Sequence, residues 1–97
     1  MIDTGDIHLA DLNEEIRRRV LVLSNARFNS LSGRALVAPE VIGEPDAVPF
    51  PWRPVVDSTV YAVDLARTMP IARLLERVDR APAAVVSQAR RTLAHIT

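Results

Sequence analysis

The chain contains no cysteine and no lysine. Without cysteine it has no disulfide bridges, thiolate metal sites or thiol nucleophiles, and it suits a reducing compartment. Without lysine, all 12 basic residues are arginines, which bind phosphate in a bidentate manner better than lysine does. A biased genomic base composition is the alternative explanation. Only three glycines are present, and they form no glycine-rich phosphate loop. Arginine is therefore the residue type best able to hold an anion here.

Long apolar runs are also missing. No stretch approaches the roughly 20 apolar residues that a membrane-spanning helix needs, and the opening residues, MIDTGDIH, carry neither a basic region nor an apolar signal segment. The 12 acidic residues balance the arginines to a net charge of zero, which argues against a broad basic face for duplex nucleic acid. We therefore expect a cytoplasmic protein in which any site for a polyanion is local.

The apolar sequence that is present suffices for one small domain. The 97 residues are 48% hydrophobic, so 1–97 should form a single globular domain that buries about 60–65% of its unfolded surface. Alternating or continuously apolar stretches predict strands at 5–12, 19–24, 34–39, 58–66 and, after a turn at Pro70, 74–79. The turn-rich segment 25–33 is expected to be a loop, so the two strands around it should pair antiparallel.

Prolines and a helical repeat complete the pattern. Segment 40–57 contains four prolines and is expected to be a loop with at most an edge strand. Residues 82–96 place apolar side chains at helical spacing after Pro82, which suits a first helical position. Short antiparallel strands and one terminal helix predict a mainly β fold, a small and strongly curved barrel. Three strands are apolar on both faces, and one helix cannot cover them, so we expect a second subunit to cover part of the surface.

Three arginines, 17–19, run directly into the apolar stretch 20–23. Strand alternation directs Arg17 and Arg19 to one face and Arg18 to the other. A single guanidinium beside apolar walls suits the charge that develops on a phosphorane, because a low dielectric strengthens its effect. The alternative is a strand end whose charges are simply hydrated. The two histidines, His8 and His95, lie near opposite ends of the sequence, and nothing in it places them together as an acid–base pair.

The stretch RRRVLVLSNARFNSLSGRALVAP, residues 17–39, resembles the core of the MazF/PemK toxin family without a gap. In that family a Gly-Asp pair opens the first strand, as in GDIHLADL at 5–12, and an arginine then enters an apolar strand that ends in Leu-Ser. VDLARTMP at 63–70 resembles the family's Asp-Gln-Val-Arg-Ser/Thr-Ile segment, and 73–93 resembles its closing strand and helix. The resemblance covers nearly the whole chain.

The resemblance implies an SH3-like barrel, a symmetric homodimer and the toxin of a toxin–antitoxin pair. It implies cleavage of single-stranded RNA (messenger RNA, with transfer or ribosomal RNA as alternatives) without a metal ion or other cofactor. In that chemistry the ribose 2′-hydroxyl attacks the adjacent phosphate, a base takes its proton, an acid protonates the leaving oxygen and a cation holds the phosphorane. Arg18 falls on the family's catalytic arginine.

Three departures mark a divergent member. Arg19 replaces the proline that follows the catalytic arginine, and the loop between the first two strands is several residues shorter than is usual in the family. The family's catalytic threonine falls on Val41, which can neither donate nor accept a proton. Glu40 is our own candidate for that proton transfer, the alternative being a solvent-exposed acid at a strand end. The residues expected to bind RNA are Arg17, Arg19, Arg27, Phe28, Trp52 and Arg53, although both aromatic residues could instead serve the core or its rim.

Two other functions stay open on the same fold. One is a non-catalytic module whose groove holds RNA or a peptide, which Val41 favours. The other is a gyrase poison, but that branch acts through a terminal Trp-Gly-Ile and this sequence ends in LAHIT.

Overall fold

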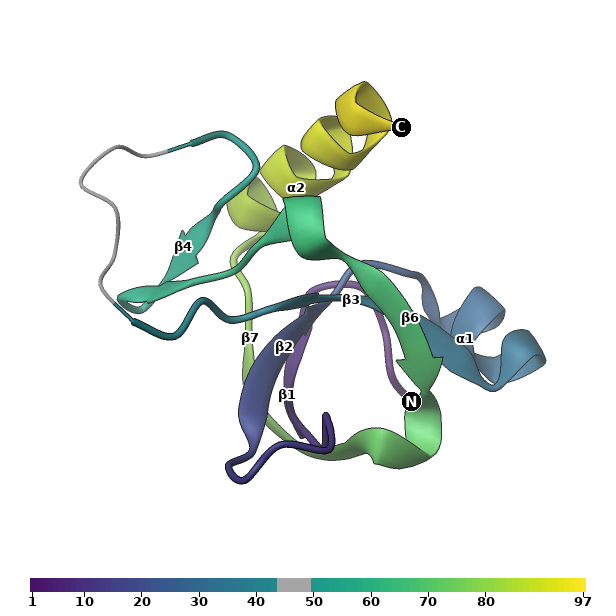
Figure 1. Ribbon diagram of the computed structural model, residues 1–97. Helices are drawn as coiled ribbons and strands as arrows, with labels where there is room; N and C mark the ends of the chain where they lie inside the picture. Colours follow the sequence, from purple (N-terminus) through teal and green to yellow (C-terminus); the bar gives the residue numbers. More distant parts are fainter. Residues whose placement is uncertain (44–49) are drawn as a thin grey trace.

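The computed structural model describes residues 1–43 and 50–97, and its main element is one antiparallel sheet (Figure 1). The strands follow the order β6-β3-β2-β1-β7, and every neighbouring pair is antiparallel. Their bounds are β1 Asp6–Ala10, β2 Arg18–Val22, β3 Arg34–Pro39, β6 Arg67–Pro70 and β7 Leu74–Arg80. The sheet curls towards a barrel, but within the described residues its edge strands β6 and β7 are joined only by the short 3₁₀ helix η2 (Ile71–Arg73) and do not pair.

Both faces of the central strand are buried, as its unbroken apolar sequence predicts. Val20, Leu21 and Val22 have no exposed surface. Alternation directs Val20 and Val22 into one cluster with Met69 of β6 and Leu74 of β7, so this cluster fills the concave side of the curled sheet. Leu21 points the other way, into a second cluster with Ile7 and Tyr61.

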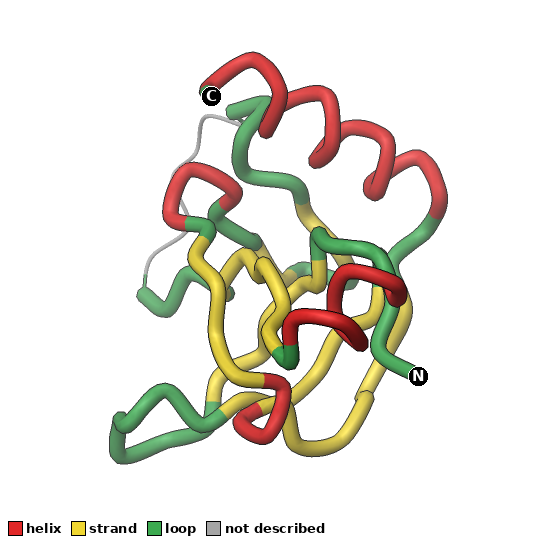
Figure 2. Tube along the Cα trace, turned by 90° about the vertical axis from the view of Figure 1, so that its right-hand side faces the viewer, coloured by secondary structure: helices red, strands yellow, loops and turns green. Residues whose placement is uncertain are grey.

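The C-terminal helix α2 (Ala83–Ile96) covers this second cluster (Figures 1 and 2). Ala89 is fully buried against it, and Val86 and Leu93 pack beside Ala89 on the same helical face. The prediction of a helix at 82–96 is confirmed, with Pro82 at the N-cap instead of the first turn. No helix among the described residues is long and apolar enough to cross a membrane.

The prediction of a loop at 25–33 is wrong, because Ala26–Ser32 form a helix, α1. Asn25 caps its first turn, accepting a hydrogen bond from the Phe28 N–H at 2.8 Å, and Gly33 ends it in the left-handed conformation at φ 70°. The buried Asn29 side chain then ties the helix to the N-terminal segment by donating to the Ile2 carbonyl at 2.9 Å, and Figure 2 shows the two side by side. The polar residues that resemble a loop are caps and anchors.

The prediction of a strand at 58–66 is also largely wrong. Only β5 (Thr59–Val60) is a strand, paired with β4 (Val55–Val56), and a 3₁₀ helix, η1 (Val63–Leu65), follows a single bridge between Tyr61 and Glu40. The strand that completes the main sheet beside β3 is β6, which begins after the predicted strand and ends at the predicted turn residue Pro70. The remaining strand predictions are confirmed within one or two residues. The prolines at 45 and 49 lie outside the described residues.

Candidate functional site

Arg18 opens β2 on the concave side of the sheet, opposite Ala10 of β1. Its side chain is 27% exposed, and one guanidinium nitrogen lies 3.3 Å from a carboxylate oxygen of Glu14 in the β1–β2 loop. The Nε atom is buried and has no hydrogen-bond partner among residues 1–43 and 50–97. The guanidinium is therefore partly desolvated and has unused donor capacity, which suits a multidentate anion.

The register of β2 and β3 decides which residue lies across from Arg19. Val20 pairs with Pro39, and the Glu40 N–H donates to the Arg19 carbonyl at 3.0 Å. Beyond Glu40 the chain pairs with the β5 side instead, and the Val41 N–H donates to the Val60 carbonyl at 2.8 Å. Glu40 is thus the residue across from Arg19, and Val41 follows it where the chain leaves β2.

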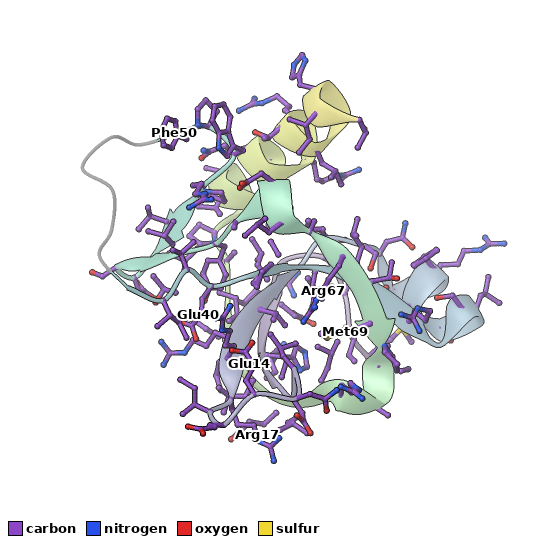
Figure 3. The ribbon with its side chains drawn as sticks, viewed as in Figure 1. Glu14, Arg17, Glu40, Phe50, Arg67 and Met69 are labelled. Carbon is purple, nitrogen blue, oxygen red and sulfur yellow. The ribbon has the colours of Figure 1, made fainter. Side chains whose placement is uncertain are left out.

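Glu40 faces Arg19 instead of Arg18. Its carboxylate accepts a hydrogen bond from the Arg19 backbone N–H at 2.8 Å, which fixes the carboxylate at the end of β2. Glu14, which the sequence analysis did not single out, is the acid in direct contact with Arg18. Figure 3 shows Glu14 and Glu40 gathered near the start of β2. We call Arg18 and Glu14 the Arg18 site, which Glu40 adjoins through Arg19.

The two flanking arginines differ in their surroundings. Arg17 pairs with Asp11 at 3.1 Å, with both side chains about half exposed. The pKa of Asp11 is lowered, first by the N–H of Asn13 and then by Arg17. Arg19 is exposed, and its guanidinium forms no ion pair within the described part of the chain. Arg17 and Arg19 thus flank the Arg18 site along the chain. Arg19 lies on the opposite face of β2 from Arg18, as strand alternation predicts, whereas Arg17 precedes the strand.

The other predicted RNA-binding residues lie elsewhere. Arg27 and Phe28 belong to α1, which follows the far end of β2, and Phe28 is 45% exposed. Trp52 is half-buried and stacks on Phe50 with ring centroids 4.9 Å apart. Arg53 makes two hydrogen bonds to the Asp64 carboxylate, at 3.2 and 3.1 Å.

The Phe50–Trp52 stack is anchored to the helix α2. The intervening Pro51 carbonyl accepts hydrogen bonds from Gln88 and Thr92 of this helix. Figure 3 shows Phe50 beside α2, at the opposite end of the molecule from Arg17. The structure therefore places Glu40 against Arg19, next to Arg18 in the chain but on the other face of β2, and separates all three from the pairs at 27–28 and 52–53.

Comparison with known proteins identifies the family. A scan against protein-family models matches residues 3–97 to the PemK-like, MazF-like toxin of type II toxin–antitoxin systems. The chain belongs to this toxin family. No curated protein matches it significantly in sequence.

Solved structures show the same toxin fold. A chain of the MazE–MazF complex from Deinococcus radiodurans (form II) is 26% identical with a TM-score of 0.81, and the match covers 98% of this chain and 93% of that one. Form I of the same complex is 29% identical with a TM-score of 0.74, covering 98% and 94%. An endoribonuclease in complex with its cognate antitoxin from a mycobacterial species shares the fold alone, at 13% identity and TM-score 0.76, covering 100% and 98%. The predicted MazF-like fold is confirmed.

Proposed function

We propose that this toxin is an endoribonuclease that cleaves single-stranded RNA in the cytoplasm without a metal ion. The observation that carries the proposal is the Arg18 guanidinium, partly buried at the strand end, with Glu14 at 3.3 Å and with an Nε that has no partner among the described residues. Membership of the MazF-like toxin family supports the same activity.

The reaction needs three groups around one phosphate. The 2′-oxygen bonds to phosphorus as its proton passes to a base, and the bond from phosphorus to the 5′-oxygen breaks as that oxygen gains a proton. The products are a 2′,3′-cyclic phosphate and a 5′-hydroxyl. Arg18 binds the non-bridging oxygens, where charge accumulates, and its partial burial strengthens this interaction relative to water. The 2′-proton passes to a carboxylate, because Val41 carries no proton-transfer group.

Glu14, which contacts Arg18, and Glu40, which adjoins the site through Arg19, are the two candidate carboxylates. Glu40 is held in place by the Arg19 N–H, which leaves its other oxygen available. Glu14 already contacts Arg18, so a phosphate that binds Arg18 lies beside Glu14 or displaces it. We retain Glu40 as the proposed base and add Glu14 as its competitor. Glu14→Gln and Glu40→Gln, measured side by side, separate them, because only loss of the base should lower the cleavage step at saturating RNA.

The test of the activity is incubation of the purified protein with a mixed RNA in EDTA, followed by sequencing of the new ends. The parent and the control variant Arg91→Ala, which removes an exposed arginine of α2, should give the same cuts. Arg18→Ala should give far fewer. Absence of cuts with the parent, or cuts that disappear in EDTA, would contradict the proposal.

One observation favours a second function, a module that binds RNA without cutting it. Val41 leaves an apolar side chain where the family's reaction uses a hydroxyl. If the parent binds RNA but does not cut it, and Val41→Thr cuts it, the binding function holds. If the parent already cuts and Val41→Thr changes little, a carboxylate serves in place of the hydroxyl.

We also propose a homodimer and an antitoxin partner with an acidic, extended segment. The supporting relatives include MazE–MazF complexes at 26% and 29% identity. The segment would pass from residues 17–19 to α1, at opposite ends of β2, a span of about 17 Å for five strand residues. Electrostatic attraction should make association fast at low salt. Raising salt to about 0.5 M, which shortens the Debye length well below 10 Å, should slow it. An unchanged association rate would remove the electrostatic part of the proposal.

A further inference from the structure

A cavity of about 300 Å³ lies on the face of β2 opposite to Arg18. Arg19 borders it, together with two carboxylates, Asp57 and Asp79, and the buried Tyr61. Ile7 and Val56 are among its apolar lining residues. We call this cavity the Arg19 pocket. Its size is at the lower end of the range for small-molecule sites, of order 300–1,000 Å³, so it suits one heterocycle.

The polar groups of the Arg19 pocket have unused hydrogen-bonding capacity. The Arg19 guanidinium has no carboxylate within ion-pair distance in the described part of the chain. One oxygen of Asp79 accepts the Arg80 N–H at 2.7 Å, which leaves the other available. Asp57 is held at the two-residue turn between β4 and β5 with φ 48°, a left-handed conformation typical of such hairpins.

The charge of the pocket selects the kind of group that can enter it. Two carboxylates and one guanidinium leave a formal charge of −1, which disfavours a phosphate. Tyr61 adds no charge, because burial and then the nearby Glu40 raise its pKa to about 12. A neutral ligand that offers both hydrogen-bond donors and acceptors matches this set.

We propose that the Arg19 pocket holds one guanine base of the bound RNA, next to the phosphate at Arg18. Guanine offers two acceptors, O6 and N7, to an arginine on one edge. It also offers two adjacent donors, N1–H and N2–H, to a carboxylate, and no other RNA base presents both pairs. The family's proline at position 19 cannot supply the guanidinium, so this recognition belongs to this chain's own sequence.

The position of the pocket fits an RNA strand that crosses the end of β2. Arg18 and Arg19 are consecutive, and their side chains lie on opposite faces of the strand. The phosphate would occupy the concave face while a neighbouring base turns to the other. This inference rests on the proposed function only for the location of the phosphate. A basic side chain of an antitoxin is the competing occupant, because it too would satisfy the carboxylates.

The test compares base preference with cleavage. A single-stranded RNA pool with a randomised window is incubated with the full-length protein, and both the cut ends and the RNA retained by the protein are sequenced. The variants are Arg19→Gln, Asp57→Asn and Asp79→Asn, all at exposed positions, with Asp64→Asn as the matched control outside the pocket. Melting temperatures establish that each variant folds.

The parent should prefer guanine at one fixed position by roughly 10- to 100-fold, the usual effect of a bidentate base contact. Arg19→Gln and Asp79→Asn should remove most of that preference, and Asp64→Asn should not. Retained RNA with this preference but no cutting would support the pocket and overturn the proposed cleavage. Cutting without a guanine preference, or with a preference that all the variants keep, would overturn the pocket and leave the cleavage intact. Variants that keep the guanine preference but bind the antitoxin more weakly would also overturn the assignment of the pocket to a base. If RNA is neither retained nor cut, both the pocket and the proposed cleavage are overturned.

Discussion

Replacing Arg18 by alanine should separate catalysis from stability. Among the described residues Arg18 has one ion-pair partner, Glu14, whose side chain is 40% exposed and can be hydrated after the change. Its Nε bonds no described group, so its removal leaves no buried atom without a partner. We therefore expect the free energy of unfolding to change by about 1 kcal/mol or less, as for a partly exposed ion pair.

The effect of Arg18→Ala on the cleavage rate should be much larger. Removing one donor from a developing oxyanion usually lowers the rate by about 10²–10³. Arg17→Ala removes an exposed residue that pairs with Asp11, and Arg19→Ala removes a side chain on the opposite face of β2. Both should weaken RNA or antitoxin binding and reduce its salt dependence while changing the rate at saturating RNA far less.

The assay is single-turnover cleavage of one defined RNA by the three alanine variants, with urea unfolding of each. Equal losses of rate for all three would show a diffuse cationic patch and refute a specific role for Arg18. A large fall in unfolding free energy for Arg18→Ala would refute the reasoning about its surroundings.

Three further predictions concern folding and assembly. Burial lowers the pKa of His8 from its usual 6.5, and its ring nitrogens have no partner among the described residues. The stability that the neutral His8 ring contributes is present above about pH 6.5 and is lost as the pH falls through the lowered pKa. The urea concentration at the unfolding midpoint should therefore fall between pH 7.5 and 5.5, and it should fall less in His8→Leu. Equal falls in the two proteins would contradict the prediction. Gly5→Ala should lower the melting temperature more than Gly33→Ala does. The reason is that Gly5 has φ 92° and an added Cβ would lie 2.9 Å from Val86 Cγ2, while nothing lies within 4 Å of a Cβ added at Gly33. An equal effect of the two changes would show that the Val86 side chain moves aside. Light scattering at micromolar concentration should give the mass of a dimer, since apolar side chains of α1 and β7 are exposed, and a monomer mass would contradict it.

Local patterns predict the sheet well, and the reasons are physical. Unbroken apolar stretches correctly indicate strands buried on both faces, because the curled sheet has one face filled by its own edge strands and the other covered by α2. The sequence does not reveal the helix α1, because Asn25 and Gly33 are typical of loops as well as of helix caps, which is the role they have here. Its seven residues are too few for a periodic apolar signal.

The candidate site was predictable only where it depends on one strand. Alternation correctly separates Arg18 from Arg19. The contact between Arg18 and Glu14 depends on the path of the β1–β2 loop, and their spacing of four residues would indicate an ion pair only in a helix. The hydrogen bond from the Arg19 N–H to Glu40 depends on the register between β2 and β3. The sequence does not reveal this register, because α1 lies between the two strands along the chain.

The most direct test of the proposed reaction uses two RNAs that differ by one oxygen atom. One is a single-stranded RNA that the protein cuts at one site, and the other carries 2′-deoxyribose at the nucleotide on the 5′ side of that bond. Both are incubated with the parent protein in EDTA, and the ends are analysed by mass spectrometry. Attack by the 2′-hydroxyl predicts that the first RNA yields a 2′,3′-cyclic phosphate and a 5′-hydroxyl while the second stays intact. Cleavage of the deoxy-substituted RNA at that bond would contradict the account.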